Sequence, residues 1–526
     1  MYTSEGLYLG LADGRRVLLH PGMANRHGLI AGASGTGKTI TMKVMAESFS
    51  DAGVPVFLCD VKGDVSGLAS PGVSSSGMEK RIDKFGLRDC FAYTAYPVAF
   101  WDLYGKNGHP IRATVSDMGP DLLARILGLT EAQTGVLNIL FKIADDKGLE
   151  LIDLKDLRAM LSHVFENKAE YIPVYGAMST QSLGGIQRAL LPLEMQGGDL
   201  FFGEPDLDIF DLMRTDSNGR GQVNLLHCVE LVQNPTLYAT FLLWLMSELF
   251  ERLPEAGDLE KPKLVFFFDE AHMLFADAPK VLVKKVEQLV KLIRSKGVGI
   301  YFVTQSPSDI PDTVLGQLSN RVQHAQRAYT PAEQKAVRAA AATMRKNPAF
   351  DAETVLQELG VGEALISFLD EDGVPGIVQK TAVICPQSLM APCTPAERTA
   401  CMQADGMAKY DETVDNLSAY ESIEEMKAEK AEADALAAER AALEKERAEF
   451  EAMKAKQEEA ERKKREKEEE AARKKYEKQL EKEAAARQKA ADRRRAQIER
   501  KLIDTGAQLL KRGLMNTLTG GSRRRR

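Results

Sequence analysis

Eight consecutive residues near the start of the chain form a complete phosphate-binding loop. They read Gly32-Ala33-Ser34-Gly35-Thr36-Gly37-Lys38-Thr39 and match G-x-x-x-x-G-K-[ST] at every fixed position. In such a loop the backbone N–H groups converge on phosphate oxygens, the lysine reaches the β- and γ-phosphates, and the hydroxyl ligates Mg²⁺. Lys38 is therefore a candidate catalytic cation and Thr39 a candidate metal ligand. The other candidate phosphate-binding residues are Gly32, Ser34, Gly35, Thr36 and Gly37.

Two acidic residues at the end of a second apolar run complete this chemistry. Asp269 and Glu270 follow residues 264–268, a run typical of a buried strand. We expect Asp269 to hold Mg²⁺, directly or through water, and Glu270 to orient and polarise the attacking water. Together with the loop, this pair predicts hydrolysis of a nucleoside triphosphate. The sequence contains no N-K-x-D motif for reading guanine, so ATP is the expected nucleotide.

The four residues 269–272 also spell the DEAH motif of another helicase superfamily. Two features argue against that assignment. The separation between Lys38 and Asp269 is far longer than that superfamily uses, and its later arginine motif, Q-x-x-G-R-x-G-R, is absent from the sequence. The acidic pair is therefore interpreted as the metal and water partner of the phosphate loop.

A third apolar run ends in a polar residue that belongs to the same chemistry. Residues 299–304 read as a strand and are followed by Gln305. Because the carboxyl ends of parallel strands meet at one edge of a sheet, Gln305 is a candidate sensor of the γ-phosphate. The alternative is a cap for the loop before Pro307. Asp60 follows another strand-like run and is a candidate for a supporting contact.

Two arginines are candidates for a finger that acts on the site of a neighbouring subunit. Such an arginine neutralises charge that develops on the transferred phosphoryl group. Arg321 lies in segment 320–327, where apolar residues alternate with polar ones, and Arg26 lies just before the first core strand. For each arginine a structural ion pair is the alternative.

The elements that carry these residues alternate between strand-like and helical patterns, which predicts an α/β fold with a mostly parallel sheet. The expected strands cover residues 27–31, 54–60, 222–228, 264–268 and 299–304, and the expected helices cover 39–47, 236–253 and 280–296. Residues 90–103 look extended, and Asp372-Gly373 predicts a hairpin between 364–369 and 377–384. Residues 121–165 have helical spacing, with a capping box at Thr130 and Gln133.

These patterns predict five parts of the chain. Residues 1–110 form the first part of an ATPase core, residues 111–215 a mainly helical insertion, and residues 216–390 the second part of the core. Residues 391–500 form a charged helical arm, with a weak coiled coil where Leu436, Leu443 and Phe450 keep a seven-residue spacing. A solvated helix or tether without a partner is the alternative for this arm. Residues 501–526 form an amphipathic helix and a basic tail.

Several segments together resemble the HerA-type branch of the HerA/FtsK ATPases. They are the run from Asn25 into the phosphate loop, the turn at residues 60–64, the segment 268–272 and Thr304-Gln305. Residues 312–317 and 320–324 extend the likeness to the bacterial HerA-like helicase family, formerly described as a domain of unknown function. The resemblance covers roughly residues 5–390.

The resemblance implies a RecA-like core, a homo-hexameric ring and nucleotide sites shared between neighbouring subunits. It carries the phosphate, metal and water contacts over to Lys38, Thr39, Asp269, Glu270 and Gln305, and the trans arginines to Arg26 and Arg321. The chain departs from HerA itself, because there is no room before the first core strand for the N-terminal β-barrel that docks a nuclease. A nuclease partnership is therefore not implied.

The expected function is that of an ATP-hydrolysing DNA translocase or helicase, with ATP and Mg²⁺ as cofactors. The alternative is an ATP-dependent switch or assembly factor that recruits a protein partner and moves no DNA. The net charge is −7, and the acidic excess lies in the first 420 residues, which disfavours passive coating of nucleic acid. An apolar stripe between residues 503 and 518, with the four terminal arginines, is a candidate docking site for DNA or a partner.

The sequence also indicates where the protein works. No N-terminal signal pattern is present, and the best apolar run, residues 237–250, is too short to span a membrane and contains Glu248. The six cysteines form no C-x-x-C pair, so we expect neither a disulfide framework nor a zinc site. The expected location is the cytoplasm, with no membrane partner.

Overall fold

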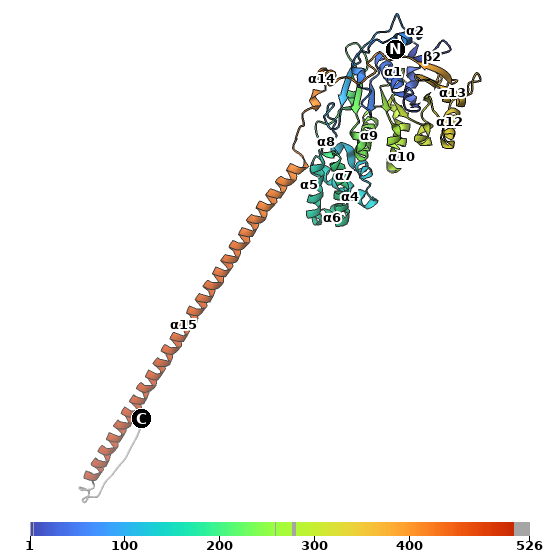
Figure 1. The fold of residues 1–526 in the computed structure, drawn as a ribbon. Coiled ribbons are helices and arrows are strands. Elements are labelled where there is room, and N and C mark those ends of the chain that lie inside the picture. Colours follow the sequence, from blue (N-terminus) through green and yellow to red (C-terminus); the bar gives the residue numbers. More distant parts are fainter. Residues whose placement is uncertain (1, 4, 258, 276–279, 510–526) are drawn as a thin grey trace. The chain divides into compact units, whose positions relative to one another are not determined.

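The computed structural model describes residues 2–3, 5–257, 259–275 and 280–509 (Figure 1). The chain divides into two units, of which the first ends at Met426 and the second begins at Lys427. The first unit contains every described strand and all the candidate site residues. The described part of the second unit belongs to one long helix, α15 (Ala419–Leu509).

A single mixed sheet organises the first unit. Its described strands number 12, and the central ones run parallel in the order β10-β4-β9-β8-β5-β7-β6. Their bounds are β4 (Gly28–Ala31), β5 (Val56–Asp60), β6 (Val98–Trp101), β7 (Val223–His227), β8 (Leu264–Phe268), β9 (Val298–Thr304) and β10 (Asn320–His324). The sequence prediction of an α/β fold with a mostly parallel, RecA-like sheet is confirmed.

Antiparallel strands extend the sheet beyond β10. The expected hairpin is present as β11 (Glu363–Ser367) and β12 (Gln379–Val383), which pair with each other, and β11 also pairs with β10. Next to β12 comes β2 (Gly6–Ala12), which also pairs with β1 (Tyr2–Thr3) and β3 (Arg15–Leu19). Strands β1, β2 and β3, from the start of the chain, therefore form the edge of the sheet that lies beyond β10, β11 and β12.

The strands in the middle of the sheet are buried along their whole length because helices cover both faces of the sheet. Every residue of β5, β8 and β9 is buried. On one face Phe267 packs in the same apolar cluster as Phe49 of α1 (Lys38–Asp51). On the other face Phe57 packs against Phe241 of α9 (Pro235–Arg252), and α10 (Lys280–Ile293) lies on this side too.

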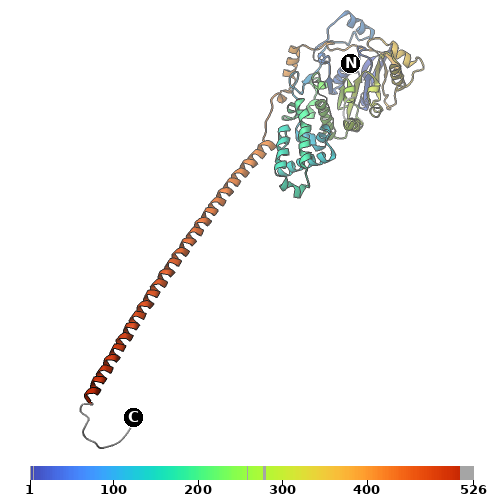
Figure 2. The ribbon, with the colours of Figure 1, turned by 60° about the horizontal axis from the view of Figure 1, so that its bottom comes forward.

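The expected helical insertion lies between β6 and β7. It comprises α3 (Val115–Ile126), α4 (Glu131–Lys147), α5 (Leu154–Glu166), α6 (Lys168–Tyr175), α7 (Thr180–Met195) and α8 (Gly198–Phe201). Figures 1 and 2 show α4–α7 gathered in one group outside the sheet. The capping box of Thr130 and Gln133 begins α4, as expected. One of the contacts between the insertion and the core is made by Phe201, whose ring lies 5.7 Å from that of Trp244 in α9.

Two local expectations are made more exact by the structure. Within the segment 90–103, which was expected to be extended, residues 98–101 form a strand, and a turn precedes the segment, with Cys90 and Phe91 both donating their N–H groups to the carbonyl of Leu87. The arm was expected to begin at residue 391, whereas the first unit continues to Met426.

The residues between 391 and 426 are retained in the first unit by buried contacts. Helix α14 (Pro395–Ala404) is followed by Met407 and Tyr410, which are 0% and 1% exposed, and Ile423 in the first turns of α15 is 0% exposed. Polar partners support them: His109 lies 2.6 Å from Asp411, and Arg112 donates to the carbonyl of Tyr410 at 2.9 Å. The polar composition of residues 391–426 therefore does not mean that this segment is exposed to solvent.

From Ala428 onward the described side chains of α15 are exposed. Leu436, Leu443 and Phe450 are 50%, 50% and 63% exposed, so their seven-residue stripe has no partner within the described chain. Whether it forms a coiled coil stays a prediction. The expected amphipathic helix and basic tail extend into residues 510–526, which lie outside the described residues. No helix among the described residues is both long and apolar enough to cross a membrane.

We expect truncation to separate the two units at residue 426 and not at residue 391. A chain ending at Met426 should keep the free energy of unfolding of the full chain. A chain ending at Asp405 should lose about 5 kcal/mol or more, because the buried area of Met407, Tyr410 and Ile423 disappears. Denaturant unfolding of the two truncated chains measures the difference. Equal stabilities would contradict the assignment of residues 406–426 to the core.

Candidate nucleotide site

The phosphate loop connects β4 to α1, as the sequence predicts. Gly37 has a φ of 111°, which favours glycine, and precedes the first turn of α1. Gly32 has a φ of 151°, and a Cβ there would lie 2.5 Å from the Cβ of His324 in β10. The N–H of Ala33 donates to the carbonyl of Ala325 at 2.8 Å. The loop is therefore packed tightly against the end of β10.

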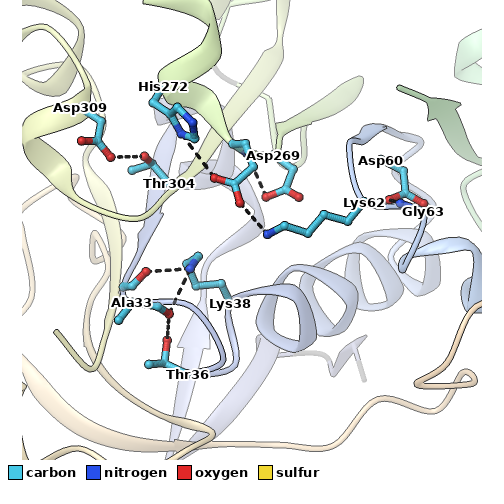
Figure 3. A network of polar contacts seen from close by, with 12 residues as sticks. Ala33, Thr36, Lys38, Asp60, Lys62, Gly63, Asp269, His272, Thr304 and Asp309 are labelled. Carbon is cyan, nitrogen blue, oxygen red and sulfur yellow. Dashed lines mark hydrogen bonds and ion pairs between the residues drawn. The ribbon is translucent and has the colours of Figure 1, made fainter. Parts of the chain in front are cut away.

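Lys38 lies across this loop. Its Nζ donates to the carbonyls of Gly32 at 2.7 Å and Ala33 at 3.1 Å (Figure 3). The side chain is buried, and burial lowers its pKa, which the negative charge of Glu270 partly restores. An ammonium group held by two carbonyls has hydrogen-bonding capacity that phosphate oxygens can take over. The geometry fits the phosphate-binding role expected for Lys38.

Asp269 lies at the carboxyl end of β8 and is 3% exposed. Its Oδ1 accepts the N–H of Glu270 at 3.0 Å, whereas its Oδ2 is buried and has no hydrogen-bond partner among the described residues. Burial raises the pKa of Asp269 to about 6, against the opposing charge of Lys62. A buried carboxylate oxygen without a partner is costly unless a cation or donor meets it. The donor set of Asp269 and the Thr39 hydroxyl fits Mg²⁺, which prefers oxygen ligands.

Glu270 is held between two basic side chains. Its Oε1 accepts from Lys62 Nζ at 2.5 Å, and its Oε2 lies 3.3 Å from Nδ1 of His272. Burial alone would raise the pKa of Glu270, but the hydrogen bond and charge of Lys62 outweigh it and leave the pKa below its usual range. Glu270 also has a φ of 47°, a left-handed backbone that is strained for a side chain of this size. Glu270 is therefore ionised and fixed in orientation.

Lys62 is a site residue to which the sequence assigned no role. It belongs to the turn after β5, and β5 pairs with β8, so the turn lies beside the acidic pair. Asp60 shapes this turn, since its carboxylate accepts the N–H groups of Gly63 at 2.7 Å and Val65 at 3.2 Å. Asp60 was expected to make a supporting contact at the site, and the contacts it makes are hydrogen bonds to the backbone of the turn that carries Lys62. The sequence contained one indication of this role: Lys62 follows the predicted strand 54–60, which lies next to the strand that ends in Asp269 and Glu270.

Gln305 follows β9, which lies between β4 and β8. Thr304 is opposite Ala31 in the pairing, and the N–H of Gly32 donates to the Thr304 carbonyl at 3.3 Å. Gln305 therefore lies at the level of the phosphate loop, with an exposed side chain. The alternative role as a loop cap is filled by Ser306, whose side chain accepts the N–H of Ser308.

The two candidate arginines lie away from the phosphate loop of their own chain. Arg26 precedes β4, whose opposite end carries the loop, and its guanidinium lies next to Gly373. Arg321 is in register with Leu29 of β4 and donates to the carbonyls of Leu318 and Leu315 at 3.0 and 3.1 Å. Its Nη1 is buried without a partner among the described residues. The contacts described for Arg321 are thus made to backbone carbonyls.

His324 connects the loop helix to β10 and β11, a contact that the sequence did not reveal. Its Nδ1 lies 3.0 Å from the Glu363 carbonyl and must donate to it, so Nε2 accepts from the Thr41 hydroxyl at 2.9 Å. Burial lowers the pKa of His324 to about 4. The neutral ring therefore fixes the first turns of α1, directly behind the phosphate loop.

With this geometry in place, comparison with known proteins assigns the family. The profile of the family described as Helicase HerA-like C-terminal matches residues 9–525. The chain therefore belongs to the HerA-like helicase family, as its motifs indicate. No curated protein matches the chain.

Solved structures show the same fold at low sequence identity. The plasmid coupling protein TrwB in complex with the GTP analogue GDPNP is 14% identical, with a TM-score of 0.50, and the match covers 75% of this chain and 92% of that chain. TrwB with the ATP analogue ADPNP is 15% identical over the same shares, with a TM-score of 0.50. VirB4 of Thermoanaerobacter pseudethanolicus is 17% identical over 76% of this chain and 99% of that chain, with a TM-score of 0.43. The chain is thus similar to TrwB in fold.

The buried state of His324 predicts a pH-dependent stability. The unfolded imidazole, with a pKa near 6.5, binds a proton as the pH falls, whereas folded His324 stays neutral until about pH 4. Protonation therefore favours the unfolded state, and His324 should account for about 2 kcal/mol of the stability lost between pH 7 and pH 5.

Denaturant unfolding of the wild type and His324→Gln at both pH values measures this contribution. The pH-dependent loss should be about 2 kcal/mol smaller in the variant. His27→Gln is a second test variant, because burial lowers the pKa of His27 to about 4 as well. An unchanged pH dependence in both variants would contradict the neutral, buried state of these rings.

Proposed function

We propose that the protein is an ATP-hydrolysing, ring-forming motor of the HerA/FtsK type that moves along DNA. The observation that carries this proposal is the placement of Asp269 and Glu270 at the end of β8, with only β9 between β8 and the strand of the phosphate loop. Family membership supports the same class of protein. Binding of ADPNP and GDPNP by the structurally similar TrwB supports nucleotide binding in this fold.

The proposed binding roles follow from the donors and acceptors at the loop. Lys38 and the loop residues Gly32, Ser34, Gly35, Thr36 and Gly37 hold the phosphates. Thr39 and Asp269 hold Mg²⁺, which, when bound, neutralises charge on the phosphate oxygens. Asp269 is suited to this because one of its oxygens is buried without a hydrogen-bond partner in the described chain.

The proposed hydrolytic roles follow from the ionised state of Glu270. As a carboxylate with a lowered pKa, it accepts a hydrogen bond from the attacking water and orients that water. Because its pKa is lowered, Glu270 is better suited to orienting the water through a hydrogen bond than to taking a proton from it. Gln305, exposed at the end of the neighbouring strand, senses the γ-phosphate. Positioning and charge stabilisation provide most of the rate enhancement in this class of reaction.

The ring is proposed from the two arginines. Neither Arg26 nor Arg321 lies at the loop end of the strand beside it, so neither is suited to the site of its own chain. In a homo-hexamer each would face the nucleotide of the neighbouring subunit. Residues 1–110 and 216–390 then form the motor, residues 111–215 the insertion, and α15 an arm that docks DNA or a protein partner.

The rival function is an ATP-dependent switch that recruits a protein and moves no DNA. The acidic excess in the first 420 residues favours it, because DNA repels a negatively charged surface. The exposed apolar stripe of α15 would then be the recruiting surface. Both functions require the same nucleotide chemistry, so only a response to DNA separates them.

We expect ATP hydrolysis that increases when duplex DNA is added. Glu270→Gln should bind ATP yet hydrolyse it at least about 10²-fold more slowly, by analogy with the loss of other water-positioning residues. Lys38→Ala should abolish nucleotide-dependent activity. Steady-state phosphate release, with and without DNA, measures all three proteins. Hydrolysis that DNA leaves unchanged would favour the switch, and near-normal turnover in Glu270→Gln would remove Glu270 from its role.

Mixed rings test whether the arginines act between subunits. Arg321→Ala and Lys38→Ala should each be inactive alone, because one lacks the finger and the other the phosphate cation. After subunit exchange, some interfaces combine an intact loop with an intact arginine and should recover part of the hydrolysis rate. Arg26→Ala is tested in the same way. Absence of recovery in mixtures that demonstrably exchange subunits would argue that these arginines act within their own chain.

A further inference from the structure

The contact between Lys62 and Glu270 joins a mobile cation to a fixed carboxylate. The two side chains are 2.5 Å apart, but their exposures differ widely, at 47% for Lys62 and 7% for Glu270. A long lysine stem with solvent access can change rotamer at little cost, whereas a carboxylate that is only 7% exposed is enclosed by packed neighbours. If the pair separates, Lys62 is therefore the group that moves.

The backbone beneath Lys62 is fixed although its side chain is not. Asp60, 3% exposed, holds the turn through the N–H groups of Gly63 and Val65. Gly63 has a φ of 77°, a conformation that favours glycine at this bend. The turn thus holds the backbone of Lys62 at a constant position next to the acidic pair. Which group the ammonium contacts therefore depends on the side-chain dihedrals of Lys62.

Lys62 and Lys38 share one electrostatic environment. Burial is the main reason that the pKa of Lys38 is lowered, and the positive charge of Lys62 lowers it further. Figure 3 shows Lys38 directed to the carbonyl of Ala33 in the loop, whereas Nζ of Lys62 lies 2.5 Å from Oε1 of Glu270. A terminal phosphate that enters this space brings negative charge beside Asp269 and Glu270. Lys62 is the exposed cation able to turn towards it.

We propose that Lys62 is a positioning residue with two alternative anionic partners: Glu270 before a nucleoside triphosphate binds, and the terminal phosphate afterwards. This inference rests on the proposed function. While Lys62 is paired, its ammonium group takes one acceptor position on Oε1 of Glu270 and neutralises the carboxylate charge, so Glu270 is a weaker acceptor for the attacking water. Transfer of Lys62 frees that oxygen only when a triphosphate is present. A diphosphate lacks the terminal group and leaves the pair intact, so Lys62 makes the site distinguish ATP from ADP.

Equilibrium binding to the full chain tests this preference without turnover. The probes are ADP and the non-hydrolysable analogue AMP-PNP, and the variants are Lys62→Met, Lys62→Arg and the control Lys335→Met, which changes an exposed lysine of α12 (Pro331–Ala342). Lys62→Met should weaken AMP-PNP binding by about tenfold, the scale of one charged hydrogen bond, and leave ADP binding within about twofold. Lys62→Arg should retain the preference, and Lys335→Met should match the wild type.

A double-mutant cycle tests whether the effect passes through Glu270. Glu270→Gln removes the ionic partner, so Lys62 no longer has to leave a carboxylate and AMP-PNP should bind several-fold more tightly. This gain should vanish in the double variant Lys62→Met/Glu270→Gln. If the gain persists there, it reflects only the loss of repulsion between Glu270 and phosphate, and the exchange of partners is wrong.

The remaining outcomes are also decisive. An equal loss of affinity for both nucleotides in Lys62→Met would show a general charge or folding effect and overturn the proposal, as would unchanged binding of both. Thermal unfolding of each variant separates folding from binding. A wild-type chain that binds neither nucleotide would overturn the proposed function, and the Lys62 proposal with it. Normal wild-type binding with an unchanged preference in Lys62→Met would overturn the Lys62 proposal alone.

Discussion

Burial of the parallel strands on both faces is the constraint from which the site follows. Strands β4, β5, β8 and β9 have no exposed residue, so polar side chains are excluded from them until the strands end. Because the strands are parallel, their carboxyl ends meet at one edge of the sheet. The phosphate loop, the Lys62 turn, the acidic pair and Gln305 each begin where one of these strands stops. The same burial that stabilises the sheet therefore gathers the charged groups.

Helix α1 must hold the loop rigidly against this edge, and buried polar contacts on two sides do so. At its start Thr41 contacts His324. Farther along, Glu47 is fully buried and accepts the N–H groups of Gln387 and Ser388, while Lys43 donates to the Leu389 carbonyl. Burial raises the pKa of Glu47, and the three hydrogen bonds it accepts from residues 387 and 388 oppose that effect. Unpaired, these groups would be costly to bury, so any shift of α1 is penalised. A rigid loop leaves Lys62 as the adaptable charge of the site.

The sequence predicts those parts of the structure whose signals are local. The phosphate loop, the apolar strand before Asp269, the hairpin at Asp372 and the cap at Thr130 each depend on a few neighbouring residues, and the fold class follows from their alternation. Contacts between distant residues were not predictable. Lys62 and Glu270 are 208 positions apart, and Thr41 and His324 are 283 apart. A single sequence gives no measure of which lysine or histidine meets which partner across such distances. The functional roles at the site stay predictions.

The start of the arm shows the same limit in another form, because polar composition was taken as a sign of exposure. Tyr410 contacts the ring of Trp101 in β6 at 5.3 Å between centroids, and its hydroxyl donates to Asp211. A few residues later Ser418 and the N–H of Tyr420 bond to Asp156 of α5. The segment from 405 to 421 therefore bridges the sheet and the helical insertion before α15 leaves the first unit. A rearrangement between the sheet and the insertion would have to move or break these contacts. The segment from which α15 begins is therefore coupled to the core, independently of what the exposed part of α15 binds.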